Sequence, residues 1–179
     1  MTNTAHPWHG IDPLWNAPHI QGVLEIPQGS RIKYEVDKAS GLIRMDRLLA
    51  SSFEYPINYG FIPRTLGPDG DPLDILVITH SPVVPLTLIT CRVIGIMAMT
   101  DCGIADDKII AVAERDVSVE HIRLIQDLPL HWKEELKNFF EEYTKLENKK
   151  VMIGDFSGAD VAARIIQQHI DHYQKEYGQ

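Results

Sequence analysis

Residues 69–78 read Asp69-Gly70-Asp71-Pro72-Leu73-Asp74-Ile75-Leu76-Val77-Ile78, three carboxylates in six residues followed directly by an apolar run. Gly70 permits a tight turn, and Pro72 favours an extended conformation at Asp71. We therefore expect the acids to project together from the start of a buried strand. Unneutralised charges about 4 Å apart repel by roughly 4 kcal/mol per pair at an effective dielectric near 20, so this crowding is costly unless a cation lies between them.

Carboxylate oxygens suit hard cations such as Mg²⁺, which takes one or two carboxylates and completes its shell with water and substrate phosphate oxygens. An ordinary polar turn is the alternative for a single hexapeptide of this kind. An EF-hand loop does not fit, because Asp74 replaces the sixth-position glycine and His80 replaces the final glutamate. A second acidic group lies between two predicted strands: Asp101, Asp106 and Asp107, followed by Lys108. Two such loops could share several metals, although an ordinary solvated hairpin loop is the alternative.

Short segments with strand character surround the hexapeptide. Ile32, Tyr34 and Val36 alternate with charged residues, as in a half-buried strand. We expect residues 21–26 and 31–37 to pair through a turn at 27–30. Further strands are predicted at residues 42–49, 74–79, 88–99, 108–114 and 149–156. Many short strands separated by Gly, Pro, Asp and Ser predict a small barrel.

Helical periodicity is confined to the last third of the chain. Apolar residues recur at intervals of three and four from Trp132 to Leu146, behind Pro129. A second helix is predicted from Ser157, as the N-cap, to about Tyr177. The fold class is therefore mainly β, or α+β, with helices beside a barrel.

The whole chain limits the possible functions. Its 179 residues, 44% of them apolar, predict one domain, residues 1–179, with a leader at residues 1–20. Cys91 and Cys102 suggest reduced, structural cysteines. Without an apolar stretch of about 20 residues or a signal pattern, we expect a cytoplasmic protein with no membrane partner. The net charge of −8 argues against nucleic acid.

Basic and phenolic residues add donors for a phosphate ligand. Lys33 and Glu35 share one face of a predicted strand, although a surface ion pair would look the same. Arg47 follows in another strand, and residues 55–60 form an aromatic-flanked loop with Tyr55 and Tyr59. Guanidinium, ammonium and phenolic groups together match the oxygens of a diphosphate.

In this order the motifs resemble those of the family I soluble inorganic pyrophosphatases, from about Glu25 to Leu146. The segments that carry the resemblance are residues 32–35, 55–60, 69–74 and 99–101, and Phe139, Phe140, Tyr143, Leu146 and Glu147. The resemblance implies hydrolysis of pyrophosphate to two phosphates. It also implies a five-stranded barrel of the OB type, a hexamer and several Mg²⁺ ions per site, with Mn²⁺ or Zn²⁺ as substitutes.

The resemblance also implies residue roles. The metal ligands would be Asp69, Asp74, Asp101 and Asp106, with Glu25 and Glu35 as outer acids. The pyrophosphate contacts would be Lys33, Arg47, Tyr59 and Tyr143, with Tyr55 and Lys108 nearby. Asp71 would be the catalytic proton acceptor for the attacking water.

Two positions depart from the family pattern. Thr144 stands where a lysine commonly follows the tyrosine matched by Tyr143, and Cys102 stands where an acid is common. We therefore expect weaker phosphate binding, tightened by Thr144→Lys. Two other functions remain as alternatives: a non-catalytic OB-type binding module, and a broader metal-dependent phosphatase. The histidines enter none of these mechanisms.

Overall fold

The computed structural model describes residues 6–147 and 150–178. The strands in this part of the chain are β1 (His19–Ile26), β2 (Ile32–Val36), β3 (Ile43–Leu48), β4 (Asn58–Phe61), β5 (Asp74–Ile78), β6 (Leu88–Asp101), β7 (Ile104–Ala105), β8 (Lys108–Ala113) and β9 (Val151–Gly158). The helices are α1 (Leu130–Glu142) and α2 (Ala159–Tyr177), with 3-10 turns at Ile125–Asp127 and Lys145–Glu147. None of the helices in the described ranges is long and apolar enough to cross a membrane.

Within residues 6–147 and 150–178, five strands close into a ring. They follow the order β1, β4, β5, β8, β6, and β6 pairs back with β1. Strands β5 and β8 run parallel, and the other pairs of the ring are antiparallel. The predicted five-stranded OB-type barrel with flanking helices is confirmed.

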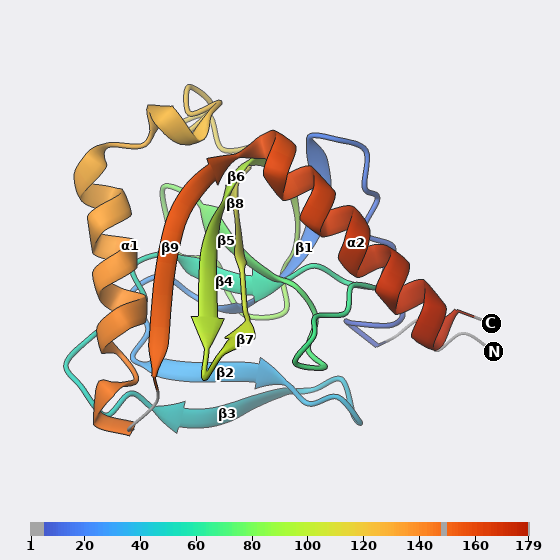
Figure 1. Cartoon of the computed structure of the whole chain (residues 1–179), viewed down its shortest axis with the longest axis horizontal. Helices are drawn as coiled ribbons and strands as arrows, with labels where there is room; N and C mark the ends of the chain where they lie inside the picture. The colour runs from blue at the N-terminus through green and yellow to red at the C-terminus, as the bar shows by residue number, and fades with distance from the viewer. Residues whose placement is uncertain (1–5, 148–149, 179) are drawn as a thin grey trace.

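Two further layers surround the ring (Figure 1). Strand β9 pairs with the long strand β6 outside the ring, and α1 packs against β9 while α2 packs against β6. Strands β2 and β3 form a separate hairpin, which crosses one end of the barrel in Figure 1.

Strand β5 shows why the apolar run 75–78 has no polar alternation. Leu76 and Ile78 belong to the core that includes Leu136 of α1, whereas Ile75 and Val77 face the core that includes Ile166 of α2. Both faces of the strand are covered, so each of its apolar side chains is removed from water. This burial fixes the start of β5, and with it the acids that precede the strand.

Several local predictions are wrong in detail. Strand β2 pairs with β3 and not with β1, because alternation marks a strand without naming its partner. Strand β4 lies where a loop was expected, since neighbouring strands and not periodicity impose its extended form. Ser157 is in β9 opposite Ile96, and Gly158 is the N-cap of α2. Leu146 falls in a 3-10 turn beyond α1, and residue 149 lies outside the described residues.

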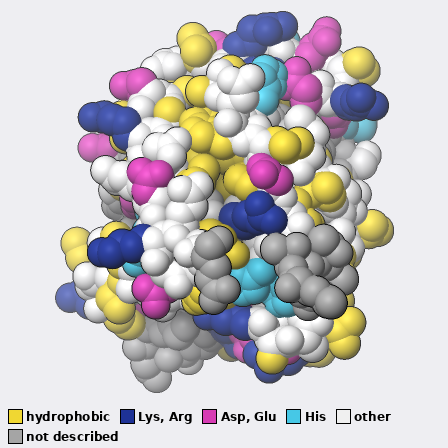
Figure 2. Space-filling model, turned by 90° about the vertical axis from the view of Figure 1, so that its right-hand side faces the viewer, with side chains coloured by type: hydrophobic (Ala, Val, Ile, Leu, Met, Phe, Trp, Pro, Cys, Tyr) yellow, Lys and Arg dark blue, Asp and Glu magenta, His cyan; other side chains and the backbone are white. Residues whose placement is uncertain are grey.

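Charge is mixed on the face that lies on the right-hand side of Figure 1. Figure 2 shows Lys and Arg side chains interspersed with Asp and Glu across it. Such a face produces little net field of one sign, unlike the basic face expected of a protein that binds nucleic acid.

Closure of the barrel between β1 and β4 depends on Gly60. A Cβ atom there would lie 2.0 Å from the carbonyl oxygen of Val23 and 2.7 Å from Cα of Leu24. We predict that Gly60→Ala lowers the free energy of unfolding by more than about 3 kcal/mol, because backbone must move. Urea unfolding measures this, with Gly22→Ala as the control, since its Cβ would meet the side chain of Ile75 at 3.3 Å. Equal effects of the two variants would contradict the prediction.

Candidate active site

A cleft of about 610 Å³ opens between the barrel end and the β2–β3 hairpin. Most of the acids, cations and phenols singled out in the sequence line it. The lining comprises Trp8, Glu25, Lys33, Tyr34, Glu35, Val36, Asp37, Lys38, Ala39, Arg44, Tyr55, Tyr59, Phe61, Asp69, Asp71, Pro72, Asp74, Asp101, Asp106, Lys108 and Tyr143. Six aspartates that are distant in sequence, up to 69 positions apart, therefore share one space with lysines and tyrosines.

Strand register brings the acidic segments together. Asp74 is the first residue of β5 and Lys108 the first of β8, and the parallel pairing places them opposite each other. Asp101 ends β6, which is antiparallel to β8, so it returns to the same end of the barrel. Asp106 precedes Lys108 by two residues. The barrel thus converts separated loops into one cluster.

Lys108 forms the centre of this cluster. Its side chain is only 2% exposed, and Nζ lies 2.5 Å from both Asp74 Oδ2 and Asp106 Oδ1. Burial alone would lower the pKa of Lys108, but the two carboxylates raise it overall, so the ammonium stays charged. Burial raises the pKa of Asp106 to about 7 despite the opposing ammonium. Tyr59 also donates to Asp74 Oδ2.

The donor set fits a divalent cation, although these residues do not enclose one tightly. In the described part of the chain, no three His, Cys, Asp or Glu side chains are close enough together to hold an ion. However, Asp101 Oδ1 is buried and has no hydrogen-bond partner among the described residues. A buried carboxylate oxygen without a partner is unfavourable, and a cation bound there would satisfy it. The available ligands are hard oxygens, as Mg²⁺ prefers.

The tyrosines in the cleft are held in their neutral form. Burial raises the pKa of Tyr55 and Tyr59 well above the usual value and that of Tyr143 to about 12. Tyr55 packs edge-on against both other rings, with centroids 5.8 Å from Tyr59 and 6.3 Å from Tyr143. Neutral phenols can donate hydrogen bonds to phosphate oxygens.

The predicted cations lie beside each other on the hairpin. Lys33 on β2 is opposite Arg47 on β3, and both contact Asp46, with Lys33 Nζ 3.6 Å from Asp46 Oδ2. Lys33 lines the cleft with Tyr59 and Tyr143, whereas Arg47 lies next to it and is not among the lining residues.

The two outer acids have different environments. Glu25 is 8% exposed, and its Oε1 accepts a hydrogen bond of 2.6 Å from the backbone N–H of Val36. Burial raises the pKa of Glu25 to about 8. Glu35 is more accessible and pairs with Arg44 at 2.5 Å.

Sequence reasoning did not assign several lining residues to the site, among them Trp8, Asp37, Lys38 and Arg44. Lys38 and Arg44 flank the turn between β2 and β3, where no spacing rule marks them as functional. Trp8 lies in the predicted leader, yet it is only 4% exposed. Proximity to the cleft is their only common signal, and it appears only in the folded chain.

Thr144 lies outside the cleft lining and is 1% exposed. Its hydroxyl has no hydrogen-bond partner among the described residues. The expectation that Thr144→Lys tightens phosphate binding stays a prediction, and from this buried position the lysine would have to extend toward the cleft to avoid burying its ammonium. Lys145 pairs with Glu142 and also lies outside the lining.

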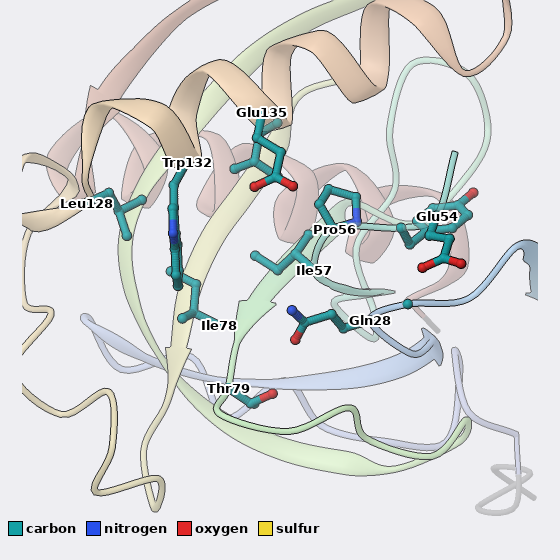
Figure 3. Close-up of a pocket in the computed structure, with 12 residues that line it drawn as sticks. Gln28, Glu54, Pro56, Ile57, Ile78, Thr79, Leu128, Trp132 and Glu135 are labelled. Atoms are coloured by element: carbon teal, nitrogen blue, oxygen red, sulfur yellow. The ribbon is translucent and has the colours of Figure 1, made fainter. Parts of the chain in front are cut away.

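A second pocket, of about 330 Å³, is shown in Figure 3. Trp132 and Ile57 stand on opposite sides of its opening, and the carboxylate of Glu135 projects over it. Its described lining residues include Glu54 and Glu135 but no Lys or Arg. It therefore does not suit a polyanion. Tyr55 lines both this pocket and the larger cleft.

Oxygen ligands, a buried ammonium and neutral phenols at one end of a closed barrel define a metal-dependent enzyme acting on phosphate compounds. The model of the inorganic pyrophosphatase family matches residues 22–174. Soluble inorganic pyrophosphatase 2 of Chlamydomonas reinhardtii is 47% identical over 174 residues, 97% of this chain and 91% of its own. Soluble inorganic pyrophosphatase 1 of Arabidopsis thaliana is 49% identical over 170 residues, 94% of this chain and 80% of its own.

A solved structure agrees with these relatives. The inorganic pyrophosphatase of Thermus thermophilus superposes with a TM-score of 0.88 at 37% identity, covering 92% of this chain and 97% of that one. The chain therefore belongs to the inorganic pyrophosphatase family. Membership implies a divalent metal cofactor.

The raised pKa of Glu25 links stability to pH. Between its ordinary value of 4.5 and the folded value of about 8, the folded chain binds a proton that the unfolded chain lacks. Stability conferred by this proton is therefore lost as pH rises through this window. We predict that Glu25→Gln, which cannot ionise, reduces the loss of stability from about pH 5.5 to about pH 7.5 by up to about 3 kcal/mol.

Urea unfolding of the chelator-treated protein at both pH values measures this difference. Glu141→Gln, at an exposed site on α1, is the matched control. Equal pH slopes in the wild type and in Glu25→Gln would contradict the prediction.

The buried hydroxyl of Thr144 can be removed at almost constant shape. We predict that Thr144→Val keeps activity and leaves the free energy of unfolding unchanged or raised by about 1 kcal/mol, because an unsatisfied polar group is lost. Thr144→Lys should lower it by about 2 kcal/mol or more. Thermal unfolding and an activity assay of both variants measure this. A less stable valine variant would show that the hydroxyl has a stabilising partner.

Proposed function

We propose that this chain hydrolyses inorganic pyrophosphate to two orthophosphates in the cleft described above. The observation that carries the proposal is the convergence of six aspartates with Lys33, Lys108, Tyr59 and Tyr143 in one space. Such a space pairs oxygen ligands for cations with donors for phosphate oxygens. The chain's net charge of −8 is thus compatible with an anionic substrate, because the field inside the cleft is set locally.

The substrate is held by cations and phenols from different elements. Lys33 on β2 and Tyr59 on β4 line the cleft from the hairpin and the barrel. Tyr143, which directly follows α1, also lines it. Arg47 lies beside Lys33 and would add a guanidinium after a side-chain rotation. Charge-assisted and phenolic hydrogen bonds would orient the two phosphates and stabilise charge on the leaving one.

Asp69, Asp74, Asp101 and Asp106 would hold the metal, which we propose to be Mg²⁺, several ions per site, with Mn²⁺ or Zn²⁺ as substitutes. When bound, such ions neutralise phosphate oxygens and lower the pKa of water. When no metal is bound, the buried ammonium of Lys108 limits the repulsion between the carboxylates of Asp74 and Asp106.

Asp71 is the proposed general base. Its carboxylate is half exposed, within the same cleft as the ligand acids. Its backbone N–H donates to Asp69 Oδ1 at 3.0 Å, which holds the turn that presents it. An accessible carboxylate on a fixed turn can accept the proton of a water that attacks phosphorus.

Assembly and location are proposed from the family resemblance alone. We propose a cytoplasmic homohexamer in which residues 1–179 form one domain, with residues 1–20 as a leader. The described part of this leader packs against the rest of the chain, since the side chains of His6 and Trp8 are both buried. Partners other than pyrophosphate and phosphate, including nucleic acid and membranes, are not part of the proposal.

Two alternatives are separated by the choice of substrate. A phosphate-release assay with pyrophosphate and Mg²⁺ distinguishes turnover from binding alone. Nucleotides and phosphate monoesters as competing substrates distinguish a pyrophosphatase from a broader metal-dependent phosphatase. Turnover of monoesters as fast as pyrophosphate would favour the broader enzyme.

The role of Asp71 is testable by one isosteric change. We predict that Asp71→Asn folds normally and loses about 10²- to 10⁴-fold in kcat, the usual contribution of a general base. Phosphate release at saturating pyrophosphate and Mg²⁺ measures kcat.

Asp155→Asn, at an exposed position on β9, is the control and should keep full activity. An unchanged rate in Asp71→Asn would remove Asp71 from the role of general base.

A further inference from the structure

Lys38 connects the β2–β3 turn with the carboxylate loop. Its ammonium forms an ion pair with Asp71 and donates a hydrogen bond of 3.1 Å to the carbonyl oxygen of Gly70. Both partners belong to the turn that presents the proposed general base. The contact spans 33 positions in sequence and lies in the wall of the cleft.

The same ammonium rests on a fixed aromatic ring. Lys38 Nζ lies 5.7 Å from the centroid of the Trp8 ring, within the range of a cation–π interaction. Trp8 is 4% exposed, and its indole N–H donates a hydrogen bond of 2.9 Å to the carbonyl oxygen of Thr65. The ring is thus anchored to the segment between β4 and the carboxylate loop.

The backbone of Lys38 is also held by the segment that carries Trp8. The backbone N–H groups of Trp8 and His9 point at His6 Nδ1, at 3.1 and 3.3 Å. Nδ1 therefore acts as an acceptor, which assigns the proton of the neutral ring to Nε2. This Nε2–H donates to the carbonyl oxygen of Lys38 at 3.0 Å. Lys38 is therefore held at its backbone and at its charged end.

We propose that Lys38, seated on Trp8, is a positioning residue that holds the Asp71 carboxylate in its productive orientation. The inference rests on the proposed role of Asp71 as general base. A half-exposed carboxylate in a turn has several accessible rotamers, and the ion pair selects one of them. The ammonium also offsets repulsion among the acids of the loop. Because a misplacement of about 1 Å can cost about 10²-fold in rate, such an orientation affects turnover.

Lys38→Met tests the charge while keeping most of the aliphatic stem. We expect kcat for pyrophosphate to fall about 10-fold with KM changed less than about twofold, because the interaction acts through the base and not on the substrate. Lys38→Arg should keep kcat within about threefold of the wild type, since a guanidinium can form the same ion pair. Lys145→Met is the matched control, because Lys145 makes a similarly exposed ion pair, with Glu142, outside the cleft.

A double-mutant cycle identifies the path of the effect. In the Asp71→Asn background, Lys38→Met should cause no further loss of kcat, because the positioned carboxylate is already gone. A loss of equal size in both backgrounds, an unchanged kcat in the single variant, or a rise in KM alone would overturn the proposal. Failure of the proposed base is distinguishable, because Asp71→Asn would then retain activity by itself. Far-ultraviolet circular dichroism of each variant confirms that the changes are not due to unfolding.

Discussion

The ion pairs of the buried Lys108 ammonium with Asp74 and Asp106 are the interactions on which the cleft depends. The ammonium lies between two carboxylates at the start of the parallel β5–β8 pair, where burial would otherwise force the acids to repel each other or to take up protons. The same strands supply the centre of the core, since β5 is buried on both faces. Packing of the core and placement of the charges are therefore one constraint, set by the register of two strands.

Charge compensation extends outward from this centre in steps. Lys108 neutralises the deepest acids, Lys38 contacts the accessible Asp71, and Arg44 pairs with Glu35 on the hairpin. Asp101 Oδ1 is buried and has no hydrogen-bond partner among the residues described, so a cation bound there would compensate an unpaired carboxylate oxygen. A negative chain can bind a polyanion because basic side chains and bound cations set the field inside the cleft locally.

Much of the candidate site was predictable because its residues carry chemical patterns. Three carboxylates in the turn 69–74 imply a cation, and tyrosines with lysines imply phosphate oxygens, so most of the lining acids and phenols were found. Arg47 was placed with Lys33 and is its strand partner, but it is not among the residues that line the cleft. Trp8 and Lys38 were missed, because their contacts join segments that are distant in sequence and carry no periodic signal.

The sequence by itself determined most of the segments that become strands and helices and the residue types that supply the chemistry, since turn residues, apolar runs and carboxylate crowding act locally. It did not determine that β2 pairs with β3, that β4 is a strand, or that Ser157 extends β9 and does not cap α2. Only the tertiary structure decided these, together with the placement of Lys108 between two acids and of the leader against the cleft. The physical reason is that strand pairing, burial and long-range charge contacts depend on which residues are neighbours in space. The order of residues along the chain does not specify those neighbours.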